Sequence, residues 1–107
     1  MQEITLSVLD EFKRRMHITH SAEDINLQQL LSFSVSAIEG DCGTFDITGG
    51  TAIDLRAKEL VFERTRYLYN DALEYFEDNF LSEINSLGLD IELKRMGTTT
   101  TTTSGGG

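Results

Sequence analysis

The residues in this sequence whose types and spacing come closest to a metal site are two histidines near its beginning. His17 and His20 are three residues apart, and Asp24 could supply a third ligand. A zinc site needs three or four ligands held by a fixed frame, and the single cysteine, Cys42, lies 22 residues beyond His20. The spacing favours a different role, in which Ser21 is the N-cap of a helix and Asp24 completes a capping box with Asp in place of Glu.

Two aspartates around a glycine loop, Asp41 and Asp46, suggest calcium. The twelve-residue ligand pattern of a calcium loop is missing, so a turn is the better interpretation. No nucleophile with a neighbouring base, no phosphate-binding loop and no metal-ligand set can be assembled from the sequence. We therefore expect no enzyme activity and no cofactor.

The charge of the chain limits the partners it can bind, because 18 acidic and 9 basic residues give a formal charge of -9. A chain this acidic is poorly suited to gripping nucleic acid through phosphates, which needs clustered Lys and Arg. Between Arg66 and Lys94 there are seven acidic residues and no basic one. Three of the seven, Asp71, Glu74 and Asp78, recur at the spacing of one helical face, and Glu77 lies beside them. Such a run is a solvated face, or it meets a partner or repels one.

Length and composition bound the class of protein. A chain of 107 residues forms one domain at most, and a chain without proline favours helices because nothing interrupts the backbone hydrogen-bond ladder. The lone cysteine fits a reducing cytoplasm, no apolar run approaches the roughly 20 residues of a membrane span, and no signal peptide opens the chain. We expect a protein that is soluble and intracellular when made.

The first half of the chain predicts two helices. The first is expected to begin at Thr5 as N-cap, with apolar side chains on one face: Val8, Leu9, Phe12 and Met16. On its other face, ion pairs are expected at the acid-first, four-residue spacing: Asp10 with Arg14 and Glu11 with Arg15. The second helix is expected over residues 22–39, and residues 44–54 form a loop in which 45–48 could be a short strand.

A long third helix is predicted over residues 54–80. Its segment ELVFERTRYLYNDALEYFEDNF holds six of the nine aromatic residues, and its apolar side chains form two adjacent stripes. These stripes cover more of the circumference than a surface helix usually buries. Apart from Glu63 before Arg66, the two arginines of this segment lack local acidic partners, so they are free to reach acids of another chain. We therefore predict a subunit interface on this helix: Phe62, Arg64, Arg66, Tyr69 and Leu73.

The end of the chain alternates apolar and polar residues over 87–93, which predicts an extended strand. A Thr/Gly-rich tail, residues 97–107, follows a helical domain of residues 1–96, and such a tail cannot bury apolar area. Because threonine favours strands, we predict that this region pairs with a partner's sheet edge: Leu89, Ile91, Leu93, Thr98, Thr99 and Thr100. The predicted fold is mainly α, a small bundle of three main helices with a long third helix, an extended C-terminal segment and a low-complexity tail.

Three segments after the first helix, LLSFSVSAIEGDCG, ELVFERTRYLYNDALEYFEDNF and LSEINSLGLDIEL, together resemble the small helical head–tail connector (adaptor or head-completion) proteins of tailed double-stranded DNA phages. The resemblance spans residues 5–93, and residues 64–80 carry most of its specificity. It implies a structural virion protein without catalysis, assembled in the host cytoplasm and located at the head–tail junction. It further implies a dodecameric ring below the portal protein, with further neck or tail-completion proteins as partners and no membrane.

Such a ring would give the long helix neighbours on both flanks. Its acidic residues would line the DNA channel of the neck, where double-stranded DNA passes without specific binding because the phosphates are repelled. The alternative is a free acidic helical protein that mimics DNA and inhibits a DNA-binding protein. The charge supports that alternative, whereas the wide apolar surface of the third helix does not.

Overall fold

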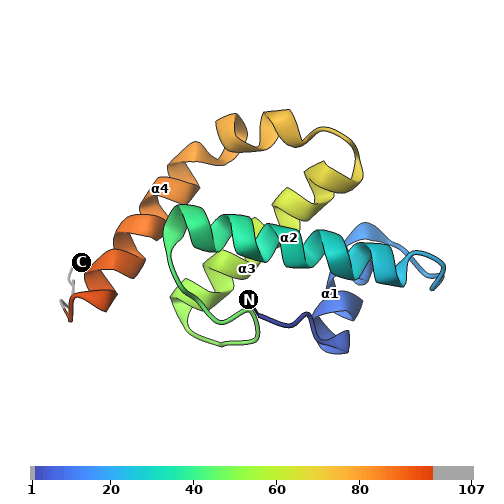
Figure 1. Cartoon of the computed structure of the whole chain (residues 1–107), viewed down its shortest axis with the longest axis horizontal. Helices are drawn as coiled ribbons and strands as arrows, with labels where there is room; N and C mark the ends of the chain where they lie inside the picture. Colours follow the sequence, from blue (N-terminus) through green and yellow to red (C-terminus); the bar gives the residue numbers. More distant parts are fainter. Residues whose placement is uncertain (1, 98–107) are drawn as a thin grey trace.

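The structure, a computed structural model, describes residues 2–97. Its elements follow one another as α1 (Leu6–Met16), α2 (Asp24–Cys42), α3 (Ala52–Tyr69), the 3-10 turn η1 (Leu73–Tyr75) and α4 (Phe76–Arg95) (Figure 1). The expected mainly helical class is confirmed, and no strand forms within residues 2–97. In the same range, none of the helices combines the length and the apolar character that a membrane span requires.

The central helix of the fold is α3. It packs against α2, η1 and α4, and α2 and α4 also contact each other. Figure 1 shows α2 crossing in front of α3, with α1 near one end of α2 and α4 near the other. Burial of apolar side chains from all four helices in one core stabilises this arrangement. Its most deeply buried members include Phe12, Leu27, Leu31, Val61, Phe62 and Leu87.

The start of α1 is as predicted, but the start of α2 is not. Thr5 caps α1, and its hydroxyl oxygen accepts a hydrogen bond from the backbone N–H of Val8 at 3.2 Å. The capping box expected at α2 does not form, because the Asp24 carboxylate instead accepts a hydrogen bond from Lys13 Nζ at 2.7 Å. Ser21 offers only its backbone carbonyl oxygen, which accepts from the Asp24 N–H at 3.2 Å.

The loop between α2 and α3 holds no strand at residues 45–48. The N-terminal segment satisfies its backbone instead, since Gln2 Nε2 donates to the carbonyl oxygen of Phe45 at 2.7 Å and Gln2 Oε1 accepts from the N–H of Ile47 at 2.7 Å. The Asp46 N–H donates to the Asp54 carboxylate at 2.9 Å. With these groups paired and Phe45 and Ile47 buried, the segment needs no strand partner.

The predicted third helix over residues 54–80 is wrong, because the chain turns back after Tyr69. Asn70 donates from its side-chain amide to the carbonyl oxygen of Arg66 at 2.9 Å, and Asp71 adopts a left-handed conformation with φ of 57°. Asn and Asp tolerate such turns better than most residues because their short polar side chains bond locally. The reversal brings aromatic rings from both sides of the turn together, with centroids 5.1 to 5.9 Å apart: Tyr67, Phe76 and Phe80.

The predicted strand over residues 87–93 is also wrong, since this segment belongs to α4. Leu87 and Ile91 are four residues apart and both buried, whereas Leu89 between them is 61% exposed. In a segment that alternates apolar and polar residues, some apolar residues also lie four apart, as they do on one face of a helix. Here the segment is helical, and packing against α2 and α3 buries such a pair. At Gly88, α4 lies close to the end of α2, since a Cβ built there would be in ordinary van der Waals contact with Cys42 Cα at 3.5 Å.

Candidate interaction surfaces

Phe62, predicted at a subunit interface, lies in the core of the single chain. Its side chain is 1% exposed, and its ring meets that of Phe12 edge-on at a centroid distance of 5.5 Å. The guanidinium of Arg15 covers the ring from outside, 5.1 Å from the centroid. No part of Phe62 can therefore pack against a second subunit, which corrects the prediction for this residue.

Arg64 is half-buried and already has an internal partner. Its Nη1 donates to the hydroxyl oxygen of Ser34, a fully buried residue of α2, at 3.2 Å. Burial lowers the pKa of Arg64, while the nearby charges of Asp41 and Glu77 oppose that change. Together with Leu73, these residues line an open hollow between α2 and the start of α4, so Arg64 is not free as the sequence predicted.

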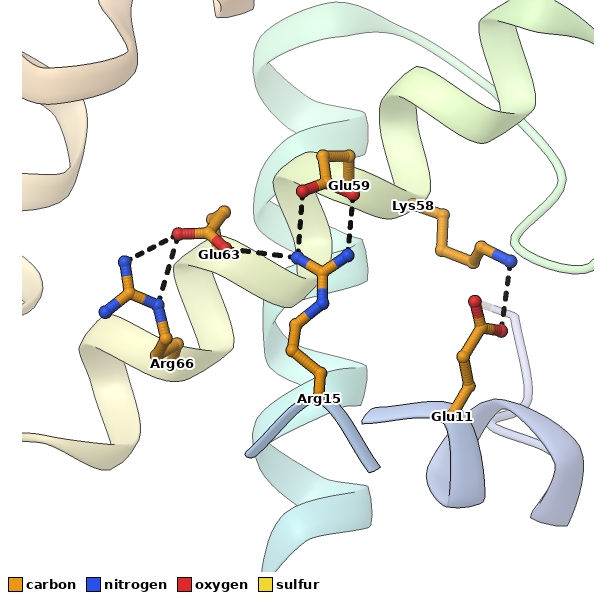
Figure 2. A network of polar contacts seen from close by, with 6 residues as sticks. All are labelled: Glu11, Arg15, Lys58, Glu59, Glu63 and Arg66. Carbon is orange, nitrogen blue, oxygen red and sulfur yellow. Dashed lines mark hydrogen bonds and ion pairs between the residues drawn. The ribbon is translucent and has the colours of Figure 1, made fainter. Parts of the chain in front are cut away.

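Arg66 belongs to a charged network that fastens α1 to α3 (Figure 2). Its Nη2 lies 2.7 Å from Glu63, whose other oxygen is 3.1 Å from Arg15 Nη1. Arg15 also makes a two-pronged contact with Glu59, at 2.7 and 2.8 Å. The predicted local pair of Glu63 with Arg66 is thus confirmed, and Arg66 retains a partly exposed guanidinium above the ring of Tyr67.

The two ion pairs predicted within α1 do not form. Glu11 accepts from Lys58 of α3 at 3.0 Å, and Arg15 turns to α3 as described above. Asp10 and Arg14 remain exposed on α1 and make no ion pair with each other. Exposed pairs within one helix contribute only a few tenths of a kcal/mol, so packing of α1 on α3 easily redirects these side chains.

Two further predicted interface residues lie at or near the surface. Tyr69 is partly exposed at the end of α3, and its hydroxyl donates to a Glu23 oxygen at 3.0 Å. This hydrogen bond raises the pKa of Tyr69. Leu73 is half-buried against the core, at the edge of the hollow that holds Arg64.

The four predicted acidic residues gather at the corner where α3 gives way to α4, here named the acidic corner: Asp71, Glu74, Glu77 and Asp78. All four are exposed, but they occupy a turn, η1 and the first turn of α4 rather than one face of a single helix. Glu77 and Asp78 sit at a helix N-terminus, where the helix dipole favours negative charge. This placement offsets part of the repulsion among them.

The predicted portal-binding residues divide into two groups. Leu89 is exposed, Leu93 is half-buried and Ile91 is buried, all on α4. Thr98, Thr99 and Thr100 lie outside the described residues. The predicted sheet-edge pairing therefore has no strand to begin from within residues 87–93.

Sequence reasoning missed an exposed apolar face on α2. Ile25 is 76% exposed and Phe33 is 58% exposed, although α2 is otherwise well packed. The signal was present in the sequence, because residues 25–38 contain no charged side chain in a chain of which 25% is charged. Exposed helix faces usually carry charges, so an uncharged one is informative.

Three of the residues considered for metals, His17, Asp24 and Asp46, have structural roles. Asp24 pairs with Lys13, and His17 ends α1 in a left-handed conformation with φ of 60°. Asp46 accepts hydrogen bonds from the backbone and the hydroxyl of Thr48. Across residues 2–97, no group of three or more His, Cys, Asp or Glu side chains is arranged to hold a metal ion.

The Arg15–Glu59 contact predicts a pH-dependent contribution to stability. The hydrogen bond from Arg15 lowers the pKa of Glu59 below its ordinary 4.5, against the opposing effect of burial. The stabilisation is therefore present above pH 4.5 and is lost as pH falls through the lower pKa of the folded state.

We expect a coupling of about 0.2–1 kcal/mol between Arg15→Met and Glu59→Gln at neutral pH, because exposed pairs are weak. Urea unfolding of both single variants and the double variant measures this coupling, which should shrink in acid. A coupling that is unchanged between pH 7 and pH 3 would contradict the assignment.

No protein-family model, curated protein or solved structure matches this sequence.

Proposed function

We propose that the chain is a structural head–tail connector of a tailed double-stranded DNA phage, forming a ring below the portal that continues the DNA channel. The observation that carries the proposal is the acidic corner, which presents Asp71, Glu74, Glu77 and Asp78 together to solvent. The sequence resemblance over residues 5–93 supplies the context. The partners are other copies of the chain, the portal protein and further neck proteins, and the location is the virion.

An acidic surface suits a channel that must pass DNA without holding it. Phosphates and carboxylates repel each other, and a ring multiplies the number of carboxylates around the lumen. The acidic corner contains no basic side chain, and the nearest arginine in the hollow beside it, Arg64, is half-buried and bonded to Ser34. DNA would therefore meet repulsion rather than a phosphate-binding site.

One observation favours a second candidate function, a DNA mimic that inhibits a DNA-binding protein. The apolar stripes of the third helix counted against it, but in the structure most of their side chains are buried or partly buried against the core. A free protein could thus expose the acidic corner to a basic partner. The connector differs in requiring contacts between copies, and labelling of particles separates the two.

Antibody labelling of particles from an infected-cell lysate tests the location. Under the connector proposal, electron microscopy should show label at the junction of head and tail. Label absent from particles, with the protein recovered bound to a DNA-binding protein, would overturn the connector role and support the mimic.

Neutralising the acidic corner should impair DNA retention or ejection while heads still assemble. The test variant is Glu74→Gln/Glu77→Gln/Asp78→Asn, with Asp71 left in place because it adopts the left-handed turn conformation. The matched control neutralises two glutamates and one aspartate that are exposed elsewhere: Glu3, Asp10 and Glu83.

The measurements are DNA content of purified particles and infectious titre. A loss of tail attachment instead would place the corner against a basic neighbour. Equal behaviour of test and control variants would leave the corner as a solvated surface.

A further inference from the structure

Residues 2–4 form a short strap that runs from the start of α1 across the α2–α3 loop, residues 44–50 (Figure 1). The burial of the side chains alternates along the strap, since Gln2 is partly buried, Glu3 is exposed and Ile4 is buried. Such alternation is typical of an extended chain, in which every second side chain points to the same side. Gln2 and Ile4 therefore both face the protein.

Gln2 uses both ends of its side-chain amide to hold the loop. Its Nε2 donates to the carbonyl oxygen of Phe45 at 2.7 Å and to Glu39 Oε2 at 2.9 Å, so both amide hydrogens are used. Its Oε1 accepts from the N–H of Ile47 at 2.7 Å. A neighbouring β-strand would pair with the same carbonyl and N–H groups. Gln2 thus takes the place of a strand partner for a loop that forms no strand.

Few hydrogen bonds join the rest of the loop to other elements. Within residues 2–97, one further bond connects it to a helix, from the Asp46 N–H to the Asp54 carboxylate of α3 at 2.9 Å. Gly43 precedes the loop and Gly50 ends it. Because glycine adopts backbone conformations that other residues avoid, the chain can pivot at both ends of the loop.

The closed loop covers apolar surface near the end of α4. Phe45 is 6% exposed and Ile47 is 2% exposed, although both belong to a loop. Phe45 also lines an open hollow together with Ile53 of α3 and Ile91 of α4. Movement of the loop away from the helices would therefore expose several apolar side chains at one place.

We propose that the strap is a latch: Gln2 holds the loop closed, and the loop opens as a unit when Gln2 leaves it, while the helices stay folded. The helices pack directly on one another, so their contacts do not require the loop. In the open state Phe45 and Ile47 are accessible, and the latch thus controls access to the apolar surface that they cover. This device belongs to the single chain and goes beyond the proposed connector role.

Native-state hydrogen exchange, followed by NMR on the purified full chain, tests the latch with two variants. Gln2→Ala removes the three hydrogen bonds of the Gln2 amide. Gln29→Ala is the matched control, because Gln29 is exposed on α2 and makes no hydrogen bond within residues 2–97. Circular dichroism should show the same helical content for both variants and the wild type.

The amide of Asp46 is the decisive probe, because its acceptor is Asp54 and Gln2→Ala leaves that pair in place. If the loop opens as a unit, the amides of Asp46 and Ile47 should both exchange at least about tenfold faster in Gln2→Ala, since several hydrogen bonds that favour the closed loop are lost. In Gln29→Ala both amides should exchange at the rate of the wild type.

Urea separates opening of the loop from unfolding of the whole chain. The urea dependence of an exchange rate grows with the surface that the opening exposes. In the wild type, low concentrations of urea should therefore change exchange little at Asp46 and Ile47. The same concentrations should strongly accelerate exchange at Leu31 and Val61, which are buried in the helical core.

Any of three results overturns the proposal. Faster exchange at Ile47 alone in Gln2→Ala would show that Gln2 protects one amide and does not hold the loop. Unchanged exchange at both loop amides would show that Gln2 holds nothing. An equal urea dependence of loop and core amides in the wild type would show that the loop opens only when the whole chain unfolds. These results are independent of particle labelling, so the connector role can fail while the latch stands.

Discussion

Replacing Phe62 with alanine is expected to lower the free energy of unfolding by about 3–5 kcal/mol. The ring is 1% exposed and packs edge-on against Phe12, so its removal leaves a cavity in the centre of the core. It also deprives the Arg15 guanidinium of the ring beneath it. The total free energy of unfolding of a domain of this size is about 5–15 kcal/mol, so the loss would be a large part of its stability.

Phe33→Ala is the matched control, because it removes the same side chain from a position that is 58% exposed. Its effect on the isolated chain should stay within about 0.5 kcal/mol, as for most surface substitutions. Urea unfolding followed by circular dichroism measures both variants at low protein concentration. Similar losses for the two would contradict the burial of Phe62 and return it to the surface as a possible interface residue.

Gly43→Ala is expected to destabilise the chain by about 2–4 kcal/mol, from backbone strain and overpacking together. Gly43 ends α2 with φ of 115°, a conformation that residues with a Cβ rarely adopt. A Cβ at this position would also lie 2.6 Å from Ile91 Cγ2, so the side chain of Ile91 or the backbone around it would have to shift. The substitution therefore strains the turn after α2 and the packing of α4 at once.

Gly40→Ala, three residues earlier, is the control with the opposite sign. Gly40 is within α2, and a Cβ there meets no atom within 4 Å. Alanine should then stabilise the monomer by about 0.4–1 kcal/mol, because the unfolded chain has less freedom to lose. The denaturation midpoint in urea, with an unchanged slope, reports both effects. A stabilising Gly43→Ala would show that the contact with Ile91 is not made.

Local features of the chain were predictable from short stretches of sequence. The mainly helical class and the cap at Thr5 depend on residues within a turn or two of each other, and both are confirmed. The pairing of Glu63 with Arg66 is likewise local and is confirmed. In each case the deciding atoms are close in sequence, so long-range packing has little to change.

The positions of the candidate surfaces were decided by tertiary structure. The chain turns at Asn70 because packing Tyr67 against Phe76 and Phe80 lowers the free energy of the folded state. These rings meet only after the chain has reversed direction. Aromatic contacts and ring burial together outweigh the small local preference for one uninterrupted helix.

Long-range packing also overrides local preference at two other places. The acidic residues lie at a corner between helices and not on one helix face, and Arg15 pairs with Glu59 of α3 and not with Glu11 of its own helix. By itself, the sequence determined that the chain is helical, acidic and uncharged along residues 25–38. Only the tertiary structure decided that Phe62 is inside and Phe33 outside, because the two residues are of the same type and differ in which helices cover their side chains.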